Sequence, residues 1–457
     1  MKAMTLKNIA AACEGELILK NESDAEKEAV SVCIDSRKAE SGGIFVATRG
    51  EKTDGHKYIG DCFNKGVLAV ICEEKPNNDG NYILVKDSFI AIKKLAKFYK
   101  SQLNIKTVGI IGSVGKTSTK ELVASVLKEK FRVCKTEGNF NNEVGVPLTI
   151  FSIGAEHEVA VIEMGISDFG EMDRLGDMVK PDVCVMTNIG PCHLEFLGDL
   201  DGVLKAKTEV FNHMTGNGIA VLNGDDNKLS TIKDVNGKRP YFYGRKDTNQ
   251  VYSSNVCSGS FDGTEVIIHT PEGDFSTVIP IPGEHMVDNA LAATAVGLFY
   301  GLSLDEIKAG IESAKTLAGR NNVIETLKWK VVDDCYNANP KSMTAAIKLL
   351  SQINDRKVAI LGDMFELGVN ENELHEQIGH ILVDNGIDVV LLAGKLTKNI
   401  EKVLKDSKAP IEYYHKDTTD ELIELIKQKD ILKTKDTILV KASHGMNFQR
   451  IVNLLTE

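Results

Sequence analysis

Short apolar runs rich in β-branched residues recur through the middle of the chain and alternate with segments of helical periodicity. Three of these runs are 108–111, 159–162 and 183–186. Apolar runs of this length without polar alternation are typical of strands in a parallel sheet that is covered on both faces. The pattern therefore predicts an α/β protein with a mostly parallel, doubly wound sheet at its centre.

The alternation of strands and helices begins again after residue 319. Four runs predict the strands of this part: 331–332, 358–361, 389–392 and 437–440. They indicate a second, Rossmann-like sheet that is independent of the first. Between 239 and 281 the pattern alternates and lacks helical periodicity, which predicts a small antiparallel patch, and a helix is expected over 287–300.

The N-terminal part carries the same signals on a smaller scale. Strands are predicted at 44–47 and 68–71, and a helix at 89–102. A chain of 457 residues is too long for one hydrophobic core. We therefore expect three domains, a small α/β domain, a central domain and a C-terminal domain, over residues 1–100, 101–317 and 318–457.

A glycine-rich turn follows the strand at 108–111 and is the strongest local motif. It reads Gly112-Ser113-Val114-Gly115-Lys116-Thr117-Ser118 and precedes a segment with a helical apolar face at 120–130. Glycines let backbone N–H groups curl around phosphate oxygens, and a helix N-terminus adds positive potential. In such a phosphate-binding loop (P-loop), Lys116 contacts the β- and γ-phosphates and the Thr117 hydroxyl ligates Mg²⁺.

The loop is shorter than the strict motif G-x-x-x-x-G-K-[ST], which would need glycine at the position of Ile110. A chance glycine turn before a helix would look similar. The strand on one side and the helix on the other favour a nucleotide site. Hydrolases, kinases and ligases all use such a loop, so the loop alone does not name a reaction.

The charge and cysteine content narrow the class of partner and the compartment. With 54 Lys and Arg against 65 Asp and Glu, the formal net charge is −11. An acidic surface repels a phosphate backbone, so we expect no nucleic-acid partner. The nine cysteines include no C-x-x-C pair, and no signal sequence or run of 18 apolar residues occurs. We therefore expect free thiols, no membrane insertion and a cytoplasmic location.

Further motifs run in a fixed order through nearly the whole chain. The N-terminal motifs are Asp35-Ser36-Arg37, Gly43-Ile44-Phe45-Val46-Ala47 and Asp54-Gly55-His56. The central motifs are Gly138-Asn139-Phe140-Asn141-Asn142-Glu143-Val144-Gly145-Val146-Pro147, Glu163-Met164-Gly165 and Thr187-Asn188-Ile189-Gly190-Pro191-Cys192-His193-Leu194-Glu195. The C-terminal motifs are Asp333-Asp334-Cys335-Tyr336-Asn337-Ala338-Asn339-Pro340 and Leu361-Gly362-Asp363-Met364-Phe365-Glu366-Leu367-Gly368.

Together these motifs resemble the Mur ligase family. The resemblance is strongest to the members that use ATP and Mg²⁺ to join D-alanyl-D-alanine to UDP-N-acetylmuramoyl-tripeptide through an acyl phosphate, in peptidoglycan precursor synthesis. Two positions depart from the family pattern: Ile111 stands where the family has threonine, and His444 where it has the arginine of K-G-S-R-G. These two substrates are the implied partners, the 1–100 domain is the implied binding domain for the UDP-linked peptide, and a monomer is expected.

Two alternatives stay open. One is a sister Mur ligase that adds the third amino acid of the peptide. The other is a non-catalytic P-loop protein that binds nucleotide without making a bond.

The resemblance implies a metal-binding set made up of Thr117, Glu163, His193 and Lys207. Glu163 ends a predicted strand, where ligands meet open α/β sheets, and its carboxylate suits Mg²⁺; a solvated acid is the ordinary alternative. A lone histidine such as His193 is more often structural. Lys207 would carry a carbamate made from CO₂, with Lys205 as a competing candidate and a solvated lysine as the ordinary alternative. With Lys116, the residues Glu163, His193 and Lys207 are the implied catalytic set.

Two further groups of residues are implied in binding. The nucleotide, held between the central and C-terminal domains, would contact the P-loop and Asn289, Arg320, Asp334, Tyr336 and Asn337. The UDP-linked peptide would contact Ser36, Arg37, Phe45, Asn139, Asn141 and Asn142. Amide side chains both donate and accept hydrogen bonds, which suits a peptide or a sugar, although Asx-rich turns are also common without any ligand. His375, among acidic neighbours, is expected on a solvated helix face.

Overall fold

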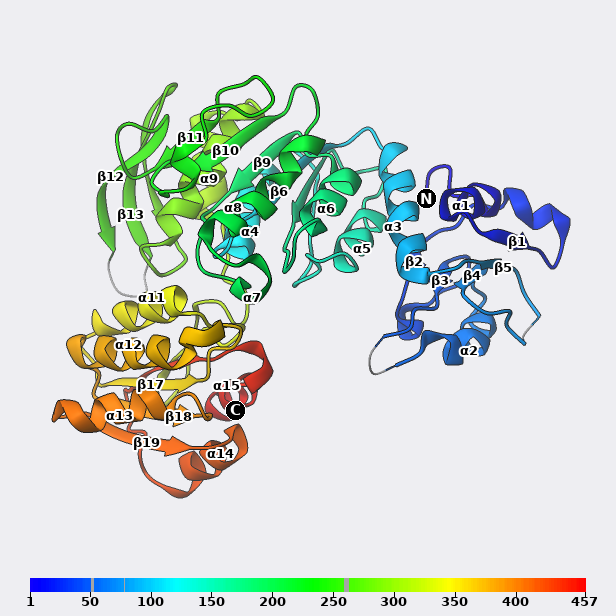
Figure 1. Cartoon of the computed structure of the whole chain (residues 1–457). Coiled ribbons are helices and arrows are strands. Elements are labelled where there is room, and N and C mark those ends of the chain that lie inside the picture. Colours follow the sequence, from blue (N-terminus) through cyan, green and yellow to red (C-terminus); the bar gives the residue numbers. More distant parts are fainter. Residues whose placement is uncertain (51–52, 78, 259–262) are drawn as a thin grey trace.

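Three sheets follow one another along the chain in the computed structural model, which describes residues 1–50, 53–77, 79–258 and 263–457 (Figure 1). The N-terminal sheet has the order β1-β5-β4-β3-β2, and only β1 runs antiparallel to its neighbour. Its strands are β1 (Glu16–Ile18), β2 (Val32–Cys33), β3 (Ile44–Val46), β4 (Ala69–Cys72) and β5 (Tyr82–Leu84). The helices of this part are α1 (Leu6–Cys13), α2 (Ile59–Asn64) and α3 (Ser88–Ser101).

The central sheet has the order β14-β13-β12-β11-β10-β9-β6-β8-β7. Its strands are β6 (Lys106–Ile111), β7 (Val133–Lys135), β8 (Val159–Glu163), β9 (Val183–Met186), β10 (Ile219–Asn223), β11 (Tyr241–Gly244), β12 (Val251–Ser258), β13 (Thr264–Thr270) and β14 (Gly273–Ile279). Neighbours from β7 to β12 are parallel, and β12, β13 and β14 pair antiparallel. The predicted antiparallel patch is therefore confirmed from β12 onward, apart from 259–262, which lie outside the described residues.

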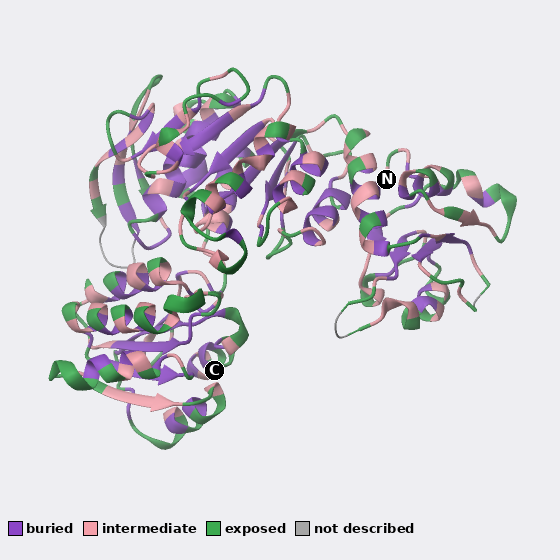
Figure 2. Cartoon of the chain, in the orientation of Figure 1, coloured by how far each residue is buried: buried purple, intermediate pink, exposed green. Residues whose placement is uncertain are grey.

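Helices cover both faces of the central sheet. They are α4 (Lys116–Lys128), α5 (Gly145–Phe151), α6 (Glu171–Val179), α7 (Leu194–Leu197), α8 (Leu200–Thr208), α9 (Met286–Phe299) and α10 (Leu304–Glu312). Successive strand residues point to opposite faces, so Ile162 packs with α5, α6 and α8 while Val161 packs with α4, α9 and α10. Figure 2 shows the resulting buried centre. The α5–α6 side is continuous, through α3, with the N-terminal core.

The C-terminal sheet has the order β15-β16-β20-β17-β18-β19, parallel except for β15. Its strands are β15 (Asn322–Glu325), β16 (Lys330–Asp333), β17 (Lys357–Gly362), β18 (Val389–Ala393), β19 (Glu412–Lys416) and β20 (Thr437–Lys441). Its helices are α11 (Pro340–Ser351), α12 (Glu371–Asp384), α13 (Lys398–Ser407), α14 (Thr419–Gln428) and α15 (Gln449–Thr456). The two faces have separate cores, one with α14 and α15 and the other with α11, α12 and α13.

The predicted α/β class and all the apolar runs named as strands are confirmed. The central helix expected at 120–130 begins earlier, at Lys116 in α4, because the P-loop leads directly into its first turn. None of the described helices combines the length and the hydropathy needed to cross a membrane. All nine cysteines are free thiols, as expected.

The expectation for His375 is wrong, because this side chain is fully buried in α12. His375 shares a helical stripe with Ile378 and Leu382, and that periodicity outweighs its charged sequence neighbours. Its Nε2 accepts a hydrogen bond from the Met364 N–H, and its Nδ1 donates to the Glu371 carbonyl. The histidine therefore supports the loop that follows β17.

Candidate active site

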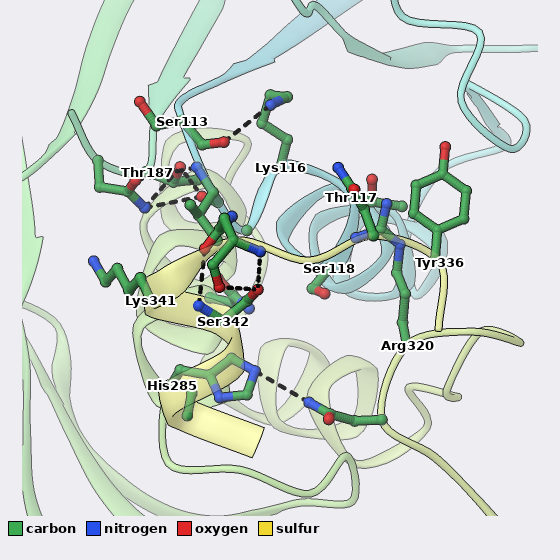
Figure 3. Close-up of a pocket in the computed structure, with 18 of the residues that line it drawn as sticks. Ser113, Lys116, Thr117, Ser118, Thr187, His285, Arg320, Tyr336, Lys341 and Ser342 are labelled. Atoms are coloured by element: carbon green, nitrogen blue, oxygen red, sulfur yellow. Dashed lines mark hydrogen bonds between the residues drawn. The ribbon is translucent and has the colours of Figure 1, made fainter. Parts of the chain in front are cut away.

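A cleft of about 360 Å³ lies between the central and C-terminal parts of the chain. This volume falls in the range of small-molecule sites. One wall is the P-loop with Asn139, Asn141 and Glu163; the other is formed by 319–321, 334–342 and Lys441. Figure 3 shows the start of α11, with Lys341 and Ser342, on the same cleft as the loop. The cleft therefore draws residues from both doubly wound sheets, as the sequence predicts for the nucleotide.

The P-loop has the backbone shape that phosphate binding requires. Gly115 caps α4 with φ of +85°, and Gly112 has φ of +150°. A Cβ on Gly112 would lie 2.0 Å from the Thr187 Oγ1, so only glycine fits there. The Lys116 Nζ turns back onto the loop and donates to the Gly112 carbonyl at 2.9 Å. It also donates to the Ser113 carbonyl at 3.4 Å (Figure 3). The loop thus holds its lysine at the point where phosphate oxygens would bind.

The segment that follows β9 braces this loop, a role that the sequence motif did not assign. The Asn188 amide closes a pair of hydrogen bonds on Val114: Nδ2 donates to the Val114 carbonyl at 2.8 Å, and Oδ1 accepts from its N–H at 3.1 Å. The Ser113 hydroxyl accepts from the Gly190 N–H at 2.9 Å. The Asn188 side chain therefore pairs with the Val114 backbone as a neighbouring strand would, and it holds the loop in place without a ligand.

Glu163 ends β8 beside the P-loop and is a buried carboxylate with one oxygen unused. It is only 1% exposed. Its Oε1 accepts from the Asn141 Nδ2 at 2.8 Å, whereas its Oε2 has no hydrogen-bond partner in the described chain. The nearest cation is the buried Lys120, whose Nζ lies 4.0 Å from Oε2. Glu163 lines the cleft beside the phosphate loop, and a carboxylate with an unused oxygen at this position suits a divalent cation.

His193 and Lys207 lie near the loop, although neither lines the cleft. Lys207, on α8, is 1% exposed, and burial together with the charge of Lys116 lowers its pKa to about 8. Apart from burial, Lys116 and Cys192 are the groups that shift this pKa, and no carboxylate from the described residues is among them. Lys205 on the same helix is exposed. Burial therefore separates the two lysines that the sequence left in competition.

His193 contacts the C-terminal part of the chain. Its Nδ1 lies 3.4 Å from the Glu366 Oε2, on the loop that His375 supports. Burial lowers the pKa of His193, and the charges of Lys207 and Lys116 lower it further, against the opposing effect of Glu366. The neutral imidazole that results is the form able to ligate a metal. Across the described residues, no three His, Cys, Asp or Glu side chains converge on one metal site by themselves.

The predicted C-terminal residues meet at the opposite wall. The Arg320 guanidinium stacks over the Tyr336 ring at 4.2 Å (Figure 3). The Asp334 Oδ2 pairs with Nζ of the buried Lys441 at 2.6 Å, and Lys441 also donates to the Asn337 carbonyl at 3.1 Å. Lys441 is a cleft residue that the sequence did not indicate. It fixes both Asp334 and Asn337.

Asn289 lies on the P-loop side of the cleft, at the start of α9. Its Oδ1 accepts from the buried Thr119 hydroxyl at 2.9 Å, and the side chain is 6% exposed. Thr119 belongs to α4, so this bond ties the P-loop helix to α9. Asn289 is thus brought to the cleft together with the loop.

The residues predicted to bind the UDP-linked peptide divide into two groups. Asn139 and Asn141 line the cleft, and the Asn142 Oδ1 accepts from the backbone N–H of Val144 and Gly145 at the start of α5. Phe140 lies between them, 6.0 Å from the Nζ of Lys38 in the N-terminal part. The asparagine cluster therefore joins the N-terminal surface to the cleft.

The N-terminal candidates differ in accessibility. Ser36 is partly exposed. The Arg37 side chain is exposed and forms a salt bridge with Asp35, with Nη2 2.7 Å from Oδ2. Those bonds lower the pKa of Asp35 to about 2. The Phe45 side chain is completely buried by β3 in the N-terminal core, and a contact of this residue with the substrate stays a prediction. In this arrangement only the backbone of Phe45 is left for such a contact.

Comparison with known families accounts for this arrangement. The Mur ligase middle domain matches residues 110–297, the Mur ligase glutamate ligase domain matches 319–444, and the Mur ligase family catalytic domain matches 28–109. The chain belongs to the Mur ligase family. The family matches follow one another in the order of the three sheets.

Full-length relatives of this Mur ligase chain include the UDP-N-acetylmuramoyl-tripeptide–D-alanyl-D-alanine ligase of Bacillus subtilis (strain 168). It is 36% identical, over 99% of this chain and 98% of the relative. A crystal structure of MurF from Acinetobacter baumannii has a TM-score of 0.87 at 29% identity, covering 99% of this chain and 98% of that one. The MurF ligase of Thermotoga maritima in complex with ADP has a TM-score of 0.80 at 30% identity, covering 93% and 96%.

Replacement of Gly112 by alanine tests the P-loop geometry. We expect Gly112→Ala to raise the Kd for ADP at least about 10-fold, or 1.4 kcal/mol, because its Cβ would collide with Thr187 and displace the loop. Gly190→Ala is the matched control, since its Cβ would meet nothing closer than 3.7 Å. Calorimetric titration with ADP measures both, and thermal melting checks folding. Equal affinity of folded Gly112→Ala and wild type would contradict this account of the loop.

Proposed function

We propose that this chain is an ATP-dependent ligase that joins D-alanyl-D-alanine to UDP-N-acetylmuramoyl-tripeptide and releases ADP and phosphate. The observation that carries the proposal is the cleft, in which the P-loop and Glu163 form one wall and residues of the C-terminal sheet form the other. Full-length similarity to D-alanyl-D-alanine-adding ligases supports the substrate class. The step belongs to peptidoglycan precursor synthesis, and we place it in the cytoplasm.

The reaction needs an activated acid because a carboxylate resists attack by an amine. Transfer of the γ-phosphoryl group of ATP to the free carboxylate of the peptide gives an acyl phosphate. The amine of D-alanyl-D-alanine then attacks the carbonyl carbon, and the tetrahedral intermediate expels inorganic phosphate. In such transfers the protein chiefly positions the reactants and stabilises charge. Lys116 and the N-terminus of α4 supply that positive potential to the phosphates.

The residues at the P-loop fit a magnesium ion. Glu163 offers a buried oxygen without a partner, and the Thr117 hydroxyl lies on the same cleft. Mg²⁺ in proteins is commonly held by one or two carboxylates together with substrate phosphates, so a lone acid here is sufficient. We assign Glu163 and Thr117 to the ion, with neutral His193 as a further ligand. When bound, the ion would neutralise the phosphate charge that develops during transfer.

Lys207 fits the carbamate that the family resemblance implies. A buried ammonium without a carboxylate partner is unfavourable, and the neighbouring Lys116 makes it more so. A neutral amine at this position can add CO₂ and lose a proton, which leaves a carbamate anion. The negative charge would then offset Lys116 and assist the same cation site. We therefore propose that Lys207, and not Lys205, is carbamylated.

The remaining roles follow the walls of the cleft. We propose that Asn289, Arg320, Asp334, Tyr336 and Asn337 bind the nucleotide, and that Ser36, Arg37, Asn139, Asn141 and Asn142 bind the UDP-linked peptide. The domain limits near residues 100 and 317, and the monomeric state, remain predictions. Neither alternative explains the site as well. A non-catalytic binder would not need the Glu163 and Lys207 arrangement, and the full-length relatives named above add D-alanyl-D-alanine and not a third amino acid.

A two-substrate assay tests the proposed function. Phosphate release from ATP should require UDP-N-acetylmuramoyl-tripeptide and D-alanyl-D-alanine together, because the acyl phosphate forms on one and is resolved by the other. The assay measures phosphate with each substrate alone and with both, using tripeptides that end in lysine or in diaminopimelate. Rapid release without the dipeptide, or none with both, would refute the ligase.

Substitution of the two lysines of α8 tests the carbamate. We expect Lys207→Ala to lower kcat on the order of 100-fold, because an anion beside the phosphates is lost. Short carboxylic acids such as formate or acetate should restore part of the activity by occupying the vacated space. Lys205→Ala, which removes an exposed lysine from the same helix, should retain wild-type kcat. Unimpaired Lys207→Ala would rule out the assignment.

A further inference from the structure

Glu143 ends the asparagine cluster and joins three parts of the chain through ion pairs. Arg174 on α6 forms a bidentate pair with its carboxylate: Nε donates to Oε1 at 2.6 Å, and Nη2 donates to Oε2 at 3.0 Å. Lys93 on α3 donates to the same Oε1 at 3.0 Å. A helix that packs on the N-terminal core, a helix of the central sheet and the loop at 139–143 therefore meet at one side chain.

This cluster is stronger than an ordinary surface pair. The Glu143 and Lys93 side chains are each about three-quarters buried. Although burial opposes ionisation, the hydrogen bonds from Arg174 and Lys93 lower the pKa of Glu143. Bidentate arginine–carboxylate pairs in a network hold geometry better than isolated exposed pairs. The Glu143 side chain is therefore held in one position relative to α3 and α6.

The middle of the same loop reaches the P-loop site through Asn141. Asn141 donates from Nδ2 to the Glu163 Oε1 at 2.8 Å, and its carbonyl accepts from the Gly165 N–H at 2.8 Å. Phe140, which precedes Asn141, is exposed, and its ring lies 6.0 Å from the Nζ of Lys38 in the N-terminal part. The loop therefore spans the distance from the N-terminal surface to the carboxylate that faces the cleft.

We propose that Glu143 is a positioning residue that holds the 139–143 loop as a rigid link, so that binding of the UDP-linked peptide at the loop and binding of nucleotide in the cleft strengthen each other. The inference rests on the proposed function, because it takes the UDP-linked peptide to contact this loop. The coupling would depend on two contacts that hold the loop at both Glu143 and Asn141. Glu143 fixes the loop to α3 and α6, and Asn141 carries the position of the loop to Glu163.

A second ion pair across the same helices supplies a matched control. The Lys97 Nζ on α3 lies 2.5 Å from the Asp177 Oδ2 on α6. Asp177→Asn removes a carboxylate that joins α3 to α6 without touching the loop. Glu143→Gln removes one that also anchors the loop. A difference in ADP binding between the two variants would therefore come from the anchoring of the loop and not from the packing of α3 against α6.

The experiment measures the Kd for ADP with Mg²⁺ by calorimetry, with and without saturating UDP-N-acetylmuramoyl-tripeptide. In the wild type and in Asp177→Asn, we expect the UDP-linked peptide to tighten ADP binding about 5-fold or more, the lower end of measured couplings. In Glu143→Gln, the Kd for ADP alone should stay unchanged while the tightening disappears. In the ligation assay, this variant should show a raised KM for the UDP-linked peptide with kcat reduced less.

Each result has a distinct meaning. Absence of coupling in the wild type, coupling retained in Glu143→Gln, or equal loss in both variants would overturn the proposal. Thermal melting shows whether a variant is folded, and an unchanged Kd for ADP alone shows that the cleft is intact. Failure of the wild type to ligate in the two-substrate assay would instead overturn the proposed function, so the two failures are distinguishable. Partial recovery of coupling in Glu143→Asp would support the carboxylate as the anchor.

Discussion

Buried charge that the surrounding side chains compensate only in part governs this site. One oxygen of Glu163 has no hydrogen-bond donor in the described chain, and the charge of buried Lys207 is influenced by another lysine and a thiol. Moving charges out of water is costly unless they are paired, so a fold retains such groups only where bound species complete them. A cation near Glu163 and a carbamate on Lys207 would each correct the local imbalance. The two proposals therefore share one electrostatic cause.

The order of the central strands explains why the parts of the site come together. β6 lies between β9 and β8, and all three are parallel. Their carboxyl ends accordingly deliver the P-loop, Asn188 and Glu163 to one edge of the sheet. Asn188 holds the loop through Val114, and Asn289 holds its helix through Thr119. The phosphate site is thus built by backbone and amide contacts that do not depend on a ligand.

The sequence predicts best what depends on local pattern. The runs at 108–111, 159–162 and 183–186 are strands. Glu163 was expected at the end of a strand, where ligands meet open sheets, and it ends β8 beside the P-loop. At Phe45 two signals differ: the residue belongs to a motif of the family resemblance, but it lies in an apolar run that predicts a buried strand, and its side chain is buried. Among the strands that were not predicted, β10 has an apolar run that could have identified it, whereas β19 has no buried residue and therefore no apolar run. The bond from Lys441 to Asp334 joins residues more than 100 positions apart, which no periodicity can show.

The two oxygens of Glu163 lie in different environments, and this division connects the two halves of the site. One oxygen receives the Asn141 amide and so belongs to the loop that runs toward the N-terminal surface. The other has no hydrogen-bond partner in the described chain, and the residue itself lines the cleft where the P-loop and the C-terminal wall meet. A substrate bound at the loop would act on this carboxylate through Asn141, because one planar group carries both oxygens. If the proposed assignments hold, substrate and nucleotide do not bind to independent surfaces, and the rigidity of one short loop sets how strongly each binding event affects the other.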